Sequence, residues 1–326
     1  MIIEQYPVDL SIIVVACNAK DLMDECLTAV QNSQDTLSKE VIYVDNGSTD
    51  GSVEMVQEKF PDTVIIKSPT NLGFIRANNL GYPKARGKYI LMLNSDAFVG
   101  PDSFQICFDF MESHSTCGAM GCHLIDREGN MQPSARRFPT PWNLFLTKMG
   151  WVNNNISWLR GVDDLERDHQ QIFTCDWVPG CYLWTRKKIT DPLFDEFGFF
   201  LREDFFMYFD DSDLCLRIKR KGWEVYYHPT DVIHLGGANS AQLTEITEKG
   251  KLVEKYSLES EYIYFRKNYN IFYVFNNYFL TLLYASLRAI KNILKRDFAM
   301  TKKMLRRIVT VTSIVLKTRF GSRSIH

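Results

Sequence analysis

Residues 88–96, KYILMLNSD, decide the fold class that this sequence predicts. The run 89–93 is apolar without a break, and it stops at Asn94, Ser95 and Asp96. A continuous apolar run is typical of a strand that is buried on both faces of a sheet. We therefore expect a central strand of a helix-covered sheet, with a carboxylate at its end.

Four other segments have the same character and end in polar or turn-forming residues: 10–18 (LSIIVVACN), 40–48 (EVIYVDNGS), 63–69 (TVIIKSP) and 117–126 (CGAMGCHLID). Residues 21–30 and 52–60 lie between such segments and show helical periodicity. Apolar strands that alternate with helices predict an α/β fold, Rossmann-like, with a mainly parallel central sheet and helices on both faces.

The composition limits the class of protein. The chain has 326 residues with a formal net charge of -1, which argues against a protein built around nucleic acid. Its 8 cysteines show no CxxC spacing and predict reduced thiols in a cytosolic protein. Residues 1–15 lack the basic start of an export signal, so we expect none.

Order is less evident in the second half of the chain. Residues 131–171 lose periodicity and predict a long, partly mobile insertion, whereas strand character returns at 176–189 (DWVPGCYLWTRKKI) and 224–237 (EVYYHPTDVIHLGG). Residues 271–287 are strongly apolar, and 288–323 hold eleven Lys and Arg against the single acid Asp297. This C-terminal part could span a membrane, lie in its interface or dock as a helical hairpin, and its charge suits an anionic cytoplasmic leaflet.

Two acids follow strands of the predicted sheet, at the edge where such folds bind ligands. Asp96 could bind a divalent cation that bridges the phosphates of a nucleotide, or it could cap the next turn ahead of a helix beginning at Pro101 or Asp102. Asp45 precedes a strand-to-helix turn and is not explained by capping. The chain contains neither GxGxxG nor GxxxxGK[ST], so a metal at Asp96 is the simplest way to neutralise phosphates.

A second acidic group, Asp210, Asp211 and Asp213, opens a predicted helix that Gly222 closes. These acids could cap the helix and complement its dipole. Crowded carboxylates also raise one another's pKa, as a general base requires. His234 ends a strand before two glycines, where it could be structural or could face a ligand.

Six blocks in order resemble the inverting family 2 glycosyltransferases with the GT-A fold, in particular the rhamnosyltransferase-like branch of bacterial polysaccharide synthesis. The blocks are SIIVVACN, VIYVDNGSTDGS, NLGFIRANNLGYPKARGKYILMLNSD, VPGCYLW, FDEFGFFLREDFFMYFDDSDLCLRIKRKGW and VIHLGG, between Ser11 and Gly237. The resemblance implies a GT-A domain at 1–265, with a donor half at 1–125 and an acceptor half at 126–265, and a helical, membrane-associated segment at 266–326.

The resemblance also implies roles. Asp211 would be the base, supported by Asp210, while Asp96 and His234 would bind a divalent metal, Mn²⁺ or Mg²⁺. The binding site for the donor nucleotide-sugar would be lined by Cys17, Asn18, Asp45, Gly73, Asn78, Asn94, Ser95 and Asp96. Trp177 and Gly180 would contact the acceptor, with Trp177 as a stacking surface for a sugar ring.

The sequence departs from the family pattern at two points. Asn94 stands where a full DxD motif has its first acid, so fewer carboxylates remain for the metal. The pair Asn78 and Asn79 replaces an Ala-Arg-Asn of other branches, so no arginine is carried over, and Pro83 should kink or shorten its helix.

The expected function is transfer of a sugar from a UDP- or dTDP-sugar to a glycan or lipid-linked acceptor at the inner face of the cell membrane. A nucleotidyltransferase is disfavoured because residues 16–21, ACNAKD, supply only Lys20 to a triphosphate. A catalytically silent nucleotide-sugar or glycan-binding module is the other alternative. Retention of Asp96, Asp211 and His234 argues against it.

Overall fold

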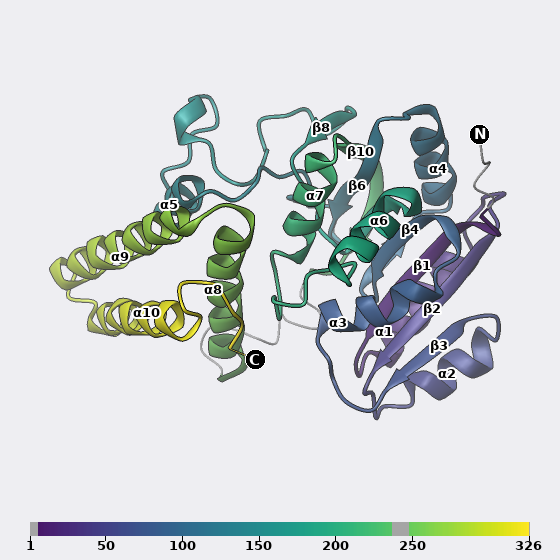
Figure 1. Cartoon of the computed structure of the whole chain (residues 1–326), viewed down its shortest axis with the longest axis horizontal. Helices are drawn as coiled ribbons and strands as arrows, with labels where there is room; N and C mark the ends of the chain where they lie inside the picture. Colours follow the sequence, from purple (N-terminus) through teal and green to yellow (C-terminus); the bar gives the residue numbers. More distant parts are fainter. Residues whose placement is uncertain (1–5, 237–247, 326) are drawn as a thin grey trace. The chain divides into compact units, whose positions relative to one another are not determined.

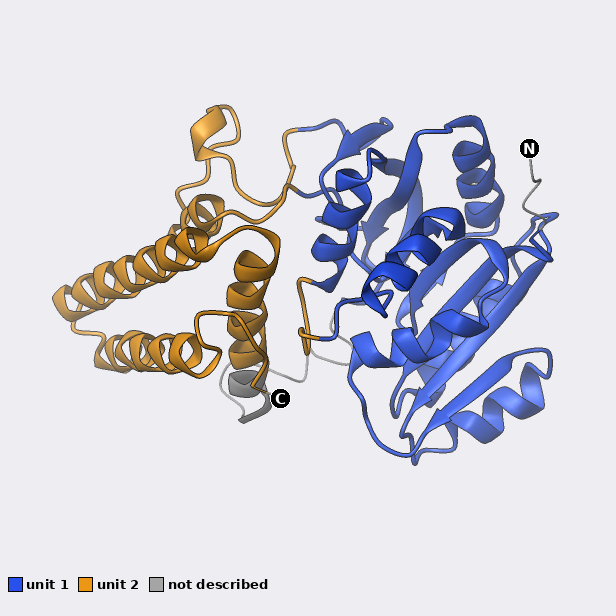
Figure 2. Ribbon diagram, viewed as in Figure 1, with its two compact units in different colours: residues 1–136, 167–203, 210–242 blue, residues 137–166, 204–209, 243–326 orange. Residues whose placement is uncertain are grey.

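The computed structural model describes residues 6–236 and 248–325 (Figure 1). Gly237, the last residue of the VIHLGG block, lies outside the described residues. The chain folds into two compact units (Figure 2). The first holds residues 1–136, 167–203 and 210–242, and the second holds 137–166, 204–209 and 243–326. The functional division expected at residue 265 stays a prediction.

The first four strands of the first unit pair in parallel in the order β3-β2-β1-β4. They are β1 (Val8–Ala16), β2 (Lys39–Asn46), β3 (Val64–Ser68) and β4 (Gly87–Asn94). Together with β6 (Cys117–Ile125) they confirm the five strands expected from apolar runs. Tyr89 to Leu93 of β4 are almost fully buried, as a central strand requires.

The sheet continues through β9 (Tyr182–Arg186), β6, β10 (Glu224–His234) and β5 (Ala97–Val99), with β7 (Met131–Gln132) on β6 and β8 (Phe173–Cys175) on β10. β6 and β10 are parallel, while β9, β5, β7 and β8 pair antiparallel to their neighbours. β1, β2, β3, β4, β6 and β10 therefore point the same way, and the expected mainly parallel sheet is confirmed.

Helices cover both faces of this sheet. The helices of this unit are α1 (Lys20–Gln31), α2 (Ser52–Lys59), α3 (Phe74–Gly81), α4 (Ser103–Ser113), α6 (Lys187–Phe197) and α7 (Asp210–Arg220). Met23 of α1 and Phe104 of α4 share a buried cluster with Ile12 of β1. On the other face, a Cβ added to Gly81 of α3 would lie 3.0 Å from Cγ2 of Ile13. Neighbouring residues of β1 thus face different helices, which explains its continuous apolar run.

Pro83 acts as the sequence predicts. α3 ends at Gly81, and the 3₁₀ helix η1 (Tyr82–Lys84) follows it directly. A proline has no N–H to donate, so an α-helix does not continue through it without a lost hydrogen bond. Helix α4 starts one residue after the expected point, with Asp102 at its N-cap position.

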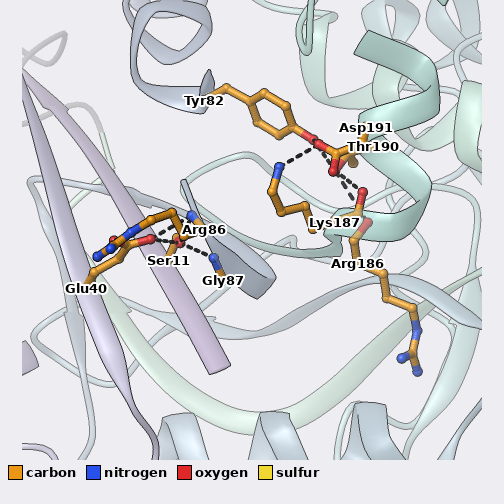
Figure 3. A network of polar contacts seen from close by, with 9 residues as sticks. All are labelled: Ser11, Glu40, Tyr82, Arg86, Gly87, Arg186, Lys187, Thr190 and Asp191. Carbon is orange, nitrogen blue, oxygen red and sulfur yellow. Dashed lines mark hydrogen bonds and ion pairs between the residues drawn. The ribbon is translucent and has the colours of Figure 1, made fainter. Parts of the chain in front are cut away.

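Buried polar contacts join the amino ends of three strands, the edge opposite the expected site (Figure 3). Glu40 of β2 accepts a hydrogen bond from Ser11 Oγ of β1 at 2.5 Å and one from the Arg86 backbone amide at 2.7 Å. Gly87 N of β4 donates to Ser11 Oγ at 2.7 Å. The Arg86 guanidinium also pairs with Glu40. Glu40 is thus a buried carboxylate with a structural role.

A second group in the same view joins η1 to α6 (Figure 3). The Tyr82 hydroxyl lies 2.7 Å from both Thr190 Oγ1 and Asp191 Oδ1, and Lys187 pairs with Asp191 at 2.6 Å. Lys187 and Asp191 therefore neutralise each other within this group.

The second unit is helical, which confirms the expected C-terminal helical segment. Its helices are α5 (Pro141–Met149), η2 (Ser157–Leu159), α8 (Glu248–Asn268), α9 (Ile271–Leu294) and α10 (Phe298–Lys317). Buried Glu261 of α8 pairs with Lys148 of α5 at 3.0 Å and accepts a hydrogen bond from Asn277 of α9 at 2.7 Å. The expected insertion at 131–171 therefore contains regular structure, because α5 packs in this unit.

Two further expectations concern the cysteines and the apolar helices. All eight cysteines are free, and all except Cys17 are buried, as reduced core thiols should be. Among the residues that the structure describes, none of the helices combines the length and the apolar character needed to cross a bilayer.

Candidate functional site

The loops after β1 and β2 interlock at the carboxyl edge of the sheet. Asn18 has a left-handed backbone (φ 51°), and its Oδ1 accepts a hydrogen bond from Thr49 N at 2.8 Å. Asn18 N in turn donates to Ser48 Oγ at 3.0 Å. Its Oδ1 is therefore committed to holding the neighbouring loop, and its predicted contact with a nucleotide would come from other atoms.

Asp45 leaves one carboxylate oxygen available at this edge. Its Oδ1 accepts hydrogen bonds from the Tyr43 hydroxyl at 3.1 Å and from Ser48 N at 3.2 Å. Its Oδ2 makes no hydrogen bond within the described part of the chain, although Asp45 is only 4% exposed. Burial raises the pKa of the nearby Cys17 thiol, and the negative charge of Asp45 raises it further. Cys17 is thus a neutral neighbour of Asp45.

Gly73 and Asn78 differ in what they offer this edge. Gly73 (φ 81°) stands at the start of α3, where its N–H donates to Asn71 Oδ1 at 2.9 Å and its carbonyl accepts from Asn46 at 3.3 Å. Asn78 is 1% exposed, and its Nδ2 donates to the Phe74 carbonyl of its own helix at 2.9 Å. Their predicted contacts with a donor stay predictions, and Asn78 keeps its amide oxygen and a second N–H for such a contact.

Strand pairing brings His234 to Asp96. β5 pairs with the end of β10, so that His234 lies opposite Ala97, and Leu235 N donates to the Asp96 carbonyl at 3.0 Å. Only Ser95 and Asp96 separate β4 from β5. As a result, His234 Nε2 lies 3.6 Å from Asp96 Oδ1, although 138 positions separate them in the chain.

Gln132 of β7 determines which nitrogen of His234 carries the proton. Gln132 Nε2 donates to the His234 carbonyl at 2.7 Å, and Oε1 of the same amide lies 3.0 Å from His234 Nδ1. Because an amide oxygen only accepts, His234 Nδ1 must be the donor. Nε2 then presents its lone pair to Asp96 whenever the ring is neutral. Burial lowers the pKa of His234, and the charge of Asp96 opposes that change.

This arrangement fits a divalent cation. Two acceptors that face each other at 3.6 Å would both be stabilised by a positive charge between them, from a proton or a metal ion. Carboxylate oxygen is a ligand for both Mn²⁺ and Mg²⁺, and imidazole nitrogen is a ligand for transition metals, so the pair suits Mn²⁺ better than Mg²⁺. Asn94 Oδ1 is a buried oxygen without a hydrogen-bond partner among the described residues, and Ser95 is 1% exposed.

The described residues hold no group of three or more His, Cys, Asp or Glu side chains that could bind a metal. Among these residues, Asp96 and His234 would supply two ligands. Mg²⁺ sites at nucleotides commonly have one or two carboxylates and take their other ligands from phosphates and water.

Asp211 is held by main-chain hydrogen bonds at the start of α7. Gly180 N donates to its Oδ2 at 3.2 Å, and Ser212 N donates to its Oδ1 at 2.7 Å. Burial raises the pKa of Asp211, and these two hydrogen bonds and the positive charge of Arg136 oppose the rise. Burial also raises the pKa of Asp210, with the charge of Asp211 as the next cause. Asp211 is the less buried of the two.

Asp213 takes part in the expected acidic group only through Asp210, whose pKa its charge helps to raise. It is fully buried and forms ion pairs with Arg217 at 2.9 Å and Arg202 at 3.1 Å. Residues two positions apart on an α-helix point about 200° apart, which turns Asp213 away from Asp211. Asp213 is thus a structural residue.

Replacing Asp213 with alanine should destabilise the fold. The change leaves the Arg217 guanidinium buried without its carboxylate, which typically costs about 3–5 kcal/mol. Chemical denaturation of Asp213→Ala measures this loss. The control is Lys221→Ala, which breaks an exposed pair with Glu196 and should change the free energy of unfolding by less than about 1 kcal/mol. Equal stability of the two variants would contradict the structural assignment.

Trp177 and Arg136 form a unit that the sequence does not reveal. The Arg136 guanidinium lies over the Trp177 ring, 5.1 Å from its centroid, and Arg136 N donates to the Trp177 carbonyl at 3.0 Å. Trp177 is 8% exposed, so little of its ring is open to a sugar. The predicted acceptor contacts of Trp177 and Gly180 stay predictions. Arg136 was missed because its partner lies 41 positions away, on another segment.

With its mainly parallel sheet and the polar residues at the carboxyl edge of that sheet, the chain is a GT-A-type α/β protein. It resembles the mannosyltransferase PcManGT from Pyrobaculum calidifontis, solved in complex with GDP-Man and Mn²⁺, with a TM-score of 0.52 and 15% identity. That likeness covers 98% of this chain and 89% of the other, and it concerns the fold alone.

Residues 11–167 match the family described as Glycosyl transferase family 2, so the chain carries a family 2 glycosyltransferase domain and the expected family is confirmed. The chain is similar to the N-acetylglucosaminyl-diphospho-decaprenol L-rhamnosyltransferase of Mycobacterium tuberculosis (strain H37Rv), 27% identical over 215 residues, 60% of this chain and 66% of that protein. It is also similar to a chondroitin synthase of Escherichia coli, 32% identical over 133 residues, 40% of this chain and 19% of that one. The chain spans less than two thirds of the length of these curated relatives.

Proposed function

We propose that this protein is an inverting, metal-dependent glycosyltransferase that moves a sugar from a UDP- or dTDP-sugar to a glycan or lipid-linked acceptor in cell-surface polysaccharide synthesis. The observation that carries the proposal is the approach of Asp96 and His234 to 3.6 Å at the carboxyl edge of a family 2 domain. A site built from one carboxylate and one imidazole suits a cation that also contacts substrate phosphates.

The donor nucleotide would lie at the ends of β1 and β2. Asp45 Oδ2 is an acceptor without a protein donor in the described residues, and uracil and thymine each offer one ring N–H. Asp96 and His234 would hold a divalent cation, Mn²⁺ or Mg²⁺. When bound there, the cation would supply positive charge to the departing diphosphate.

Asp211 would take the proton of the acceptor hydroxyl. The acceptor oxygen then bonds to the anomeric carbon as the bond from that carbon to the diphosphate oxygen breaks, in one displacement that inverts the configuration. Gly180 N and Ser212 N orient the Asp211 carboxylate, and each of its oxygens keeps a further lone pair for a hydroxyl. The raised pKa of Asp211 makes it a stronger base than an exposed aspartate. Asp210 would support it from the adjacent position at the start of α7.

A lipid-linked acceptor would place the protein in the cytoplasm, at the inner face of the cell membrane. The name of the mycobacterial relative describes a lipid-linked substrate. The basic C-terminal part of this chain suits contact with an anionic leaflet. We propose such peripheral contact here as part of the function.

The test is release of nucleotide diphosphate from a panel of UDP-, dTDP- and GDP-sugars, with Mn²⁺, Mg²⁺ or EDTA, in the presence of candidate acceptors. We expect release from one donor that EDTA abolishes and Mn²⁺ or Mg²⁺ restores. Calorimetric titration of the same donors accompanies it. Donor binding without turnover against any acceptor would favour the silent binding module, and neither binding nor turnover would contradict both functions.

A further inference from the structure

Exposed apolar side chains concentrate in the second unit, on α9 and α10. The exposed side of α9 carries Phe272 (76% exposed), Phe279, Ile290 and Leu294 (80% exposed). These positions are spaced by seven, eleven and four residues, so they share one face of the helix. Large hydrophobic side chains in such a row are unusual on a surface that meets only water.

The buried side of α9 is less apolar than its exposed side. It contains Asn277, Thr281, Ala285 and Ala289, alongside Val274 and Leu280. Asn277 is buried because Glu261 of α8 accepts its hydrogen bond. A helix that meets water normally exposes its polar face. This helix reverses that order, so its outer face is suited to an apolar surrounding.

Helix α10 repeats the pattern and adds charge. Phe298, Leu305 and Val309 are exposed on one face, and Lys302 and Arg306 lie beside them. Within the described residues, neither Lys302 nor Arg306 makes an ion pair. An apolar strip bordered by unpaired cations is the pattern of a helix that lies in a membrane interface.

The turn between the two helices has the same character. Leu294 and Phe298 (71% exposed) flank Lys295 and Arg296, which make no ion pair among the described residues. Residues 288–323 hold eleven Lys and Arg and one acid, so the surroundings of the turn are strongly basic. Anionic lipid headgroups complement this charge, and acyl chains complement the apolar side chains.

We propose that the exposed faces of α9 and α10, with the 294–298 turn as the deepest point, lie in the headgroup region of an anionic membrane. This inference names the surface for the proposed membrane contact and does not depend on glycosyl transfer. The helices lie parallel to the bilayer surface and do not cross it, in agreement with the absence of any spanning helix in the described residues. Apolar insertion provides attachment, and the cations select anionic lipid.

The experiment is sedimentation of the full chain with phosphatidylcholine vesicles, with or without phosphatidylglycerol, at low and high salt. The wild type should bind the anionic vesicles, and binding should weaken at high salt. Leu294→Ser with Phe298→Ser should lower the partition coefficient about tenfold or more. Lys295→Glu with Arg296→Glu should lower the partition coefficient about fivefold or more for each charge that is changed. This second effect should be seen with anionic vesicles only.

The control is Ile106→Ser, which removes a less exposed hydrophobic side chain (40% exposed) from α4 and should leave binding unchanged. Circular dichroism checks that each variant is folded. The proposal would be overturned if the variant Leu294→Ser with Phe298→Ser bound vesicles as well as the wild type does. It would also be overturned if the wild type did not bind anionic vesicles. A concentration-dependent dimer in sedimentation velocity that the same double variant abolishes would overturn it too, because the face would then join two copies of the chain.

Discussion

Asp211→Asn should abolish sugar transfer while leaving donor and metal binding intact. The amide has nearly the same shape but cannot take the acceptor proton, and loss of a positioned general base typically costs about 10²- to 10⁴-fold in rate. Steady-state kinetics with a saturating metal should show the loss in kcat, with little change in KM for the donor. The control is Asp195→Asn, which changes an exposed aspartate of α6 in the same way and should be fully active. Full activity of Asp211→Asn would refute the assignment of the base.

The pH dependence of the wild type supplies a second readout for the same residue. A base works in its ionised form, so kcat/KM should fall as the pH drops through the pKa of Asp211. Burial raises that pKa, so the acid limb should lie above the ordinary aspartate value of about 3.9. Arg136→Met removes the cation that opposes the rise, and its acid limb should move to higher pH. An unchanged acid limb in Arg136→Met would show that Arg136 does not influence the pKa of Asp211.

Asp96→Ala should lose the divalent cation and, with it, metal-dependent turnover. Asp96 supplies the only carboxylate placed beside His234 in the described residues, at 3.6 Å. Its loss should weaken Mn²⁺ binding by more than the roughly 10- to 100-fold that removal of an outer-sphere partner costs. Electron paramagnetic resonance of free Mn²⁺ measures this without donor or turnover. The chain offers a matched control in Asp231→Ala, which removes the exposed aspartate that pairs with His123 at 2.7 Å. Equal Mn²⁺ affinity of Asp96→Ala and wild type would contradict the metal site.

Variants of Gln132 test whether the His234 imidazole is oriented to bind a metal or only lies near the site. Gln132→Leu removes the acceptor for the His234 Nδ1 proton and should weaken Mn²⁺ binding about 10- to 100-fold. Gln132→Glu keeps an acceptor there and should retain most of the affinity. In ¹⁵N spectra of the metal-free protein, His234 should be protonated at Nδ1 in the wild type and should become a mixture of tautomers in Gln132→Leu. If Gln132→Leu had the same ¹⁵N spectrum and Mn²⁺ affinity as the wild type, Gln132 would have no role in orienting His234.

The fold class could be predicted from local sequence because buried parallel strands have a local signature. β1, β2, β3, β4 and β6 each appear as an apolar run that ends in polar residues. The order of these strands with intervening helices restricts the topology, since parallel connections must cross the sheet in one hand. β5, β7 and β8 were not predicted, because strands of two or three residues take their structure from their neighbours.

The candidate site was predictable only in part. Asp45 and Asp96 stand at strand ends, where topology alone directs attention, and Asp211 opens a helix with an acidic start. The separation of Asp213 from Asp211 depends on Arg202 and Arg217, which the sequence does not mark as partners. Gln132 has no motif of its own, and its two hydrogen bonds to His234 span 102 positions.

The sequence by itself determined the α/β class, the family and the edge of the sheet at which polar residues gather. These follow from strand periodicity and from blocks of residues that are contiguous in the chain. The family resemblance implied that Asp96 and His234 share a metal, but only the tertiary structure decided how they meet, through the pairing of β5 with β10. Only the tertiary structure decided that the most apolar face of α9 is turned outward. The physical reason is that hydrogen-bond partners and burial are properties of surfaces that come together on folding, and no local pattern specifies which surface a side chain will meet.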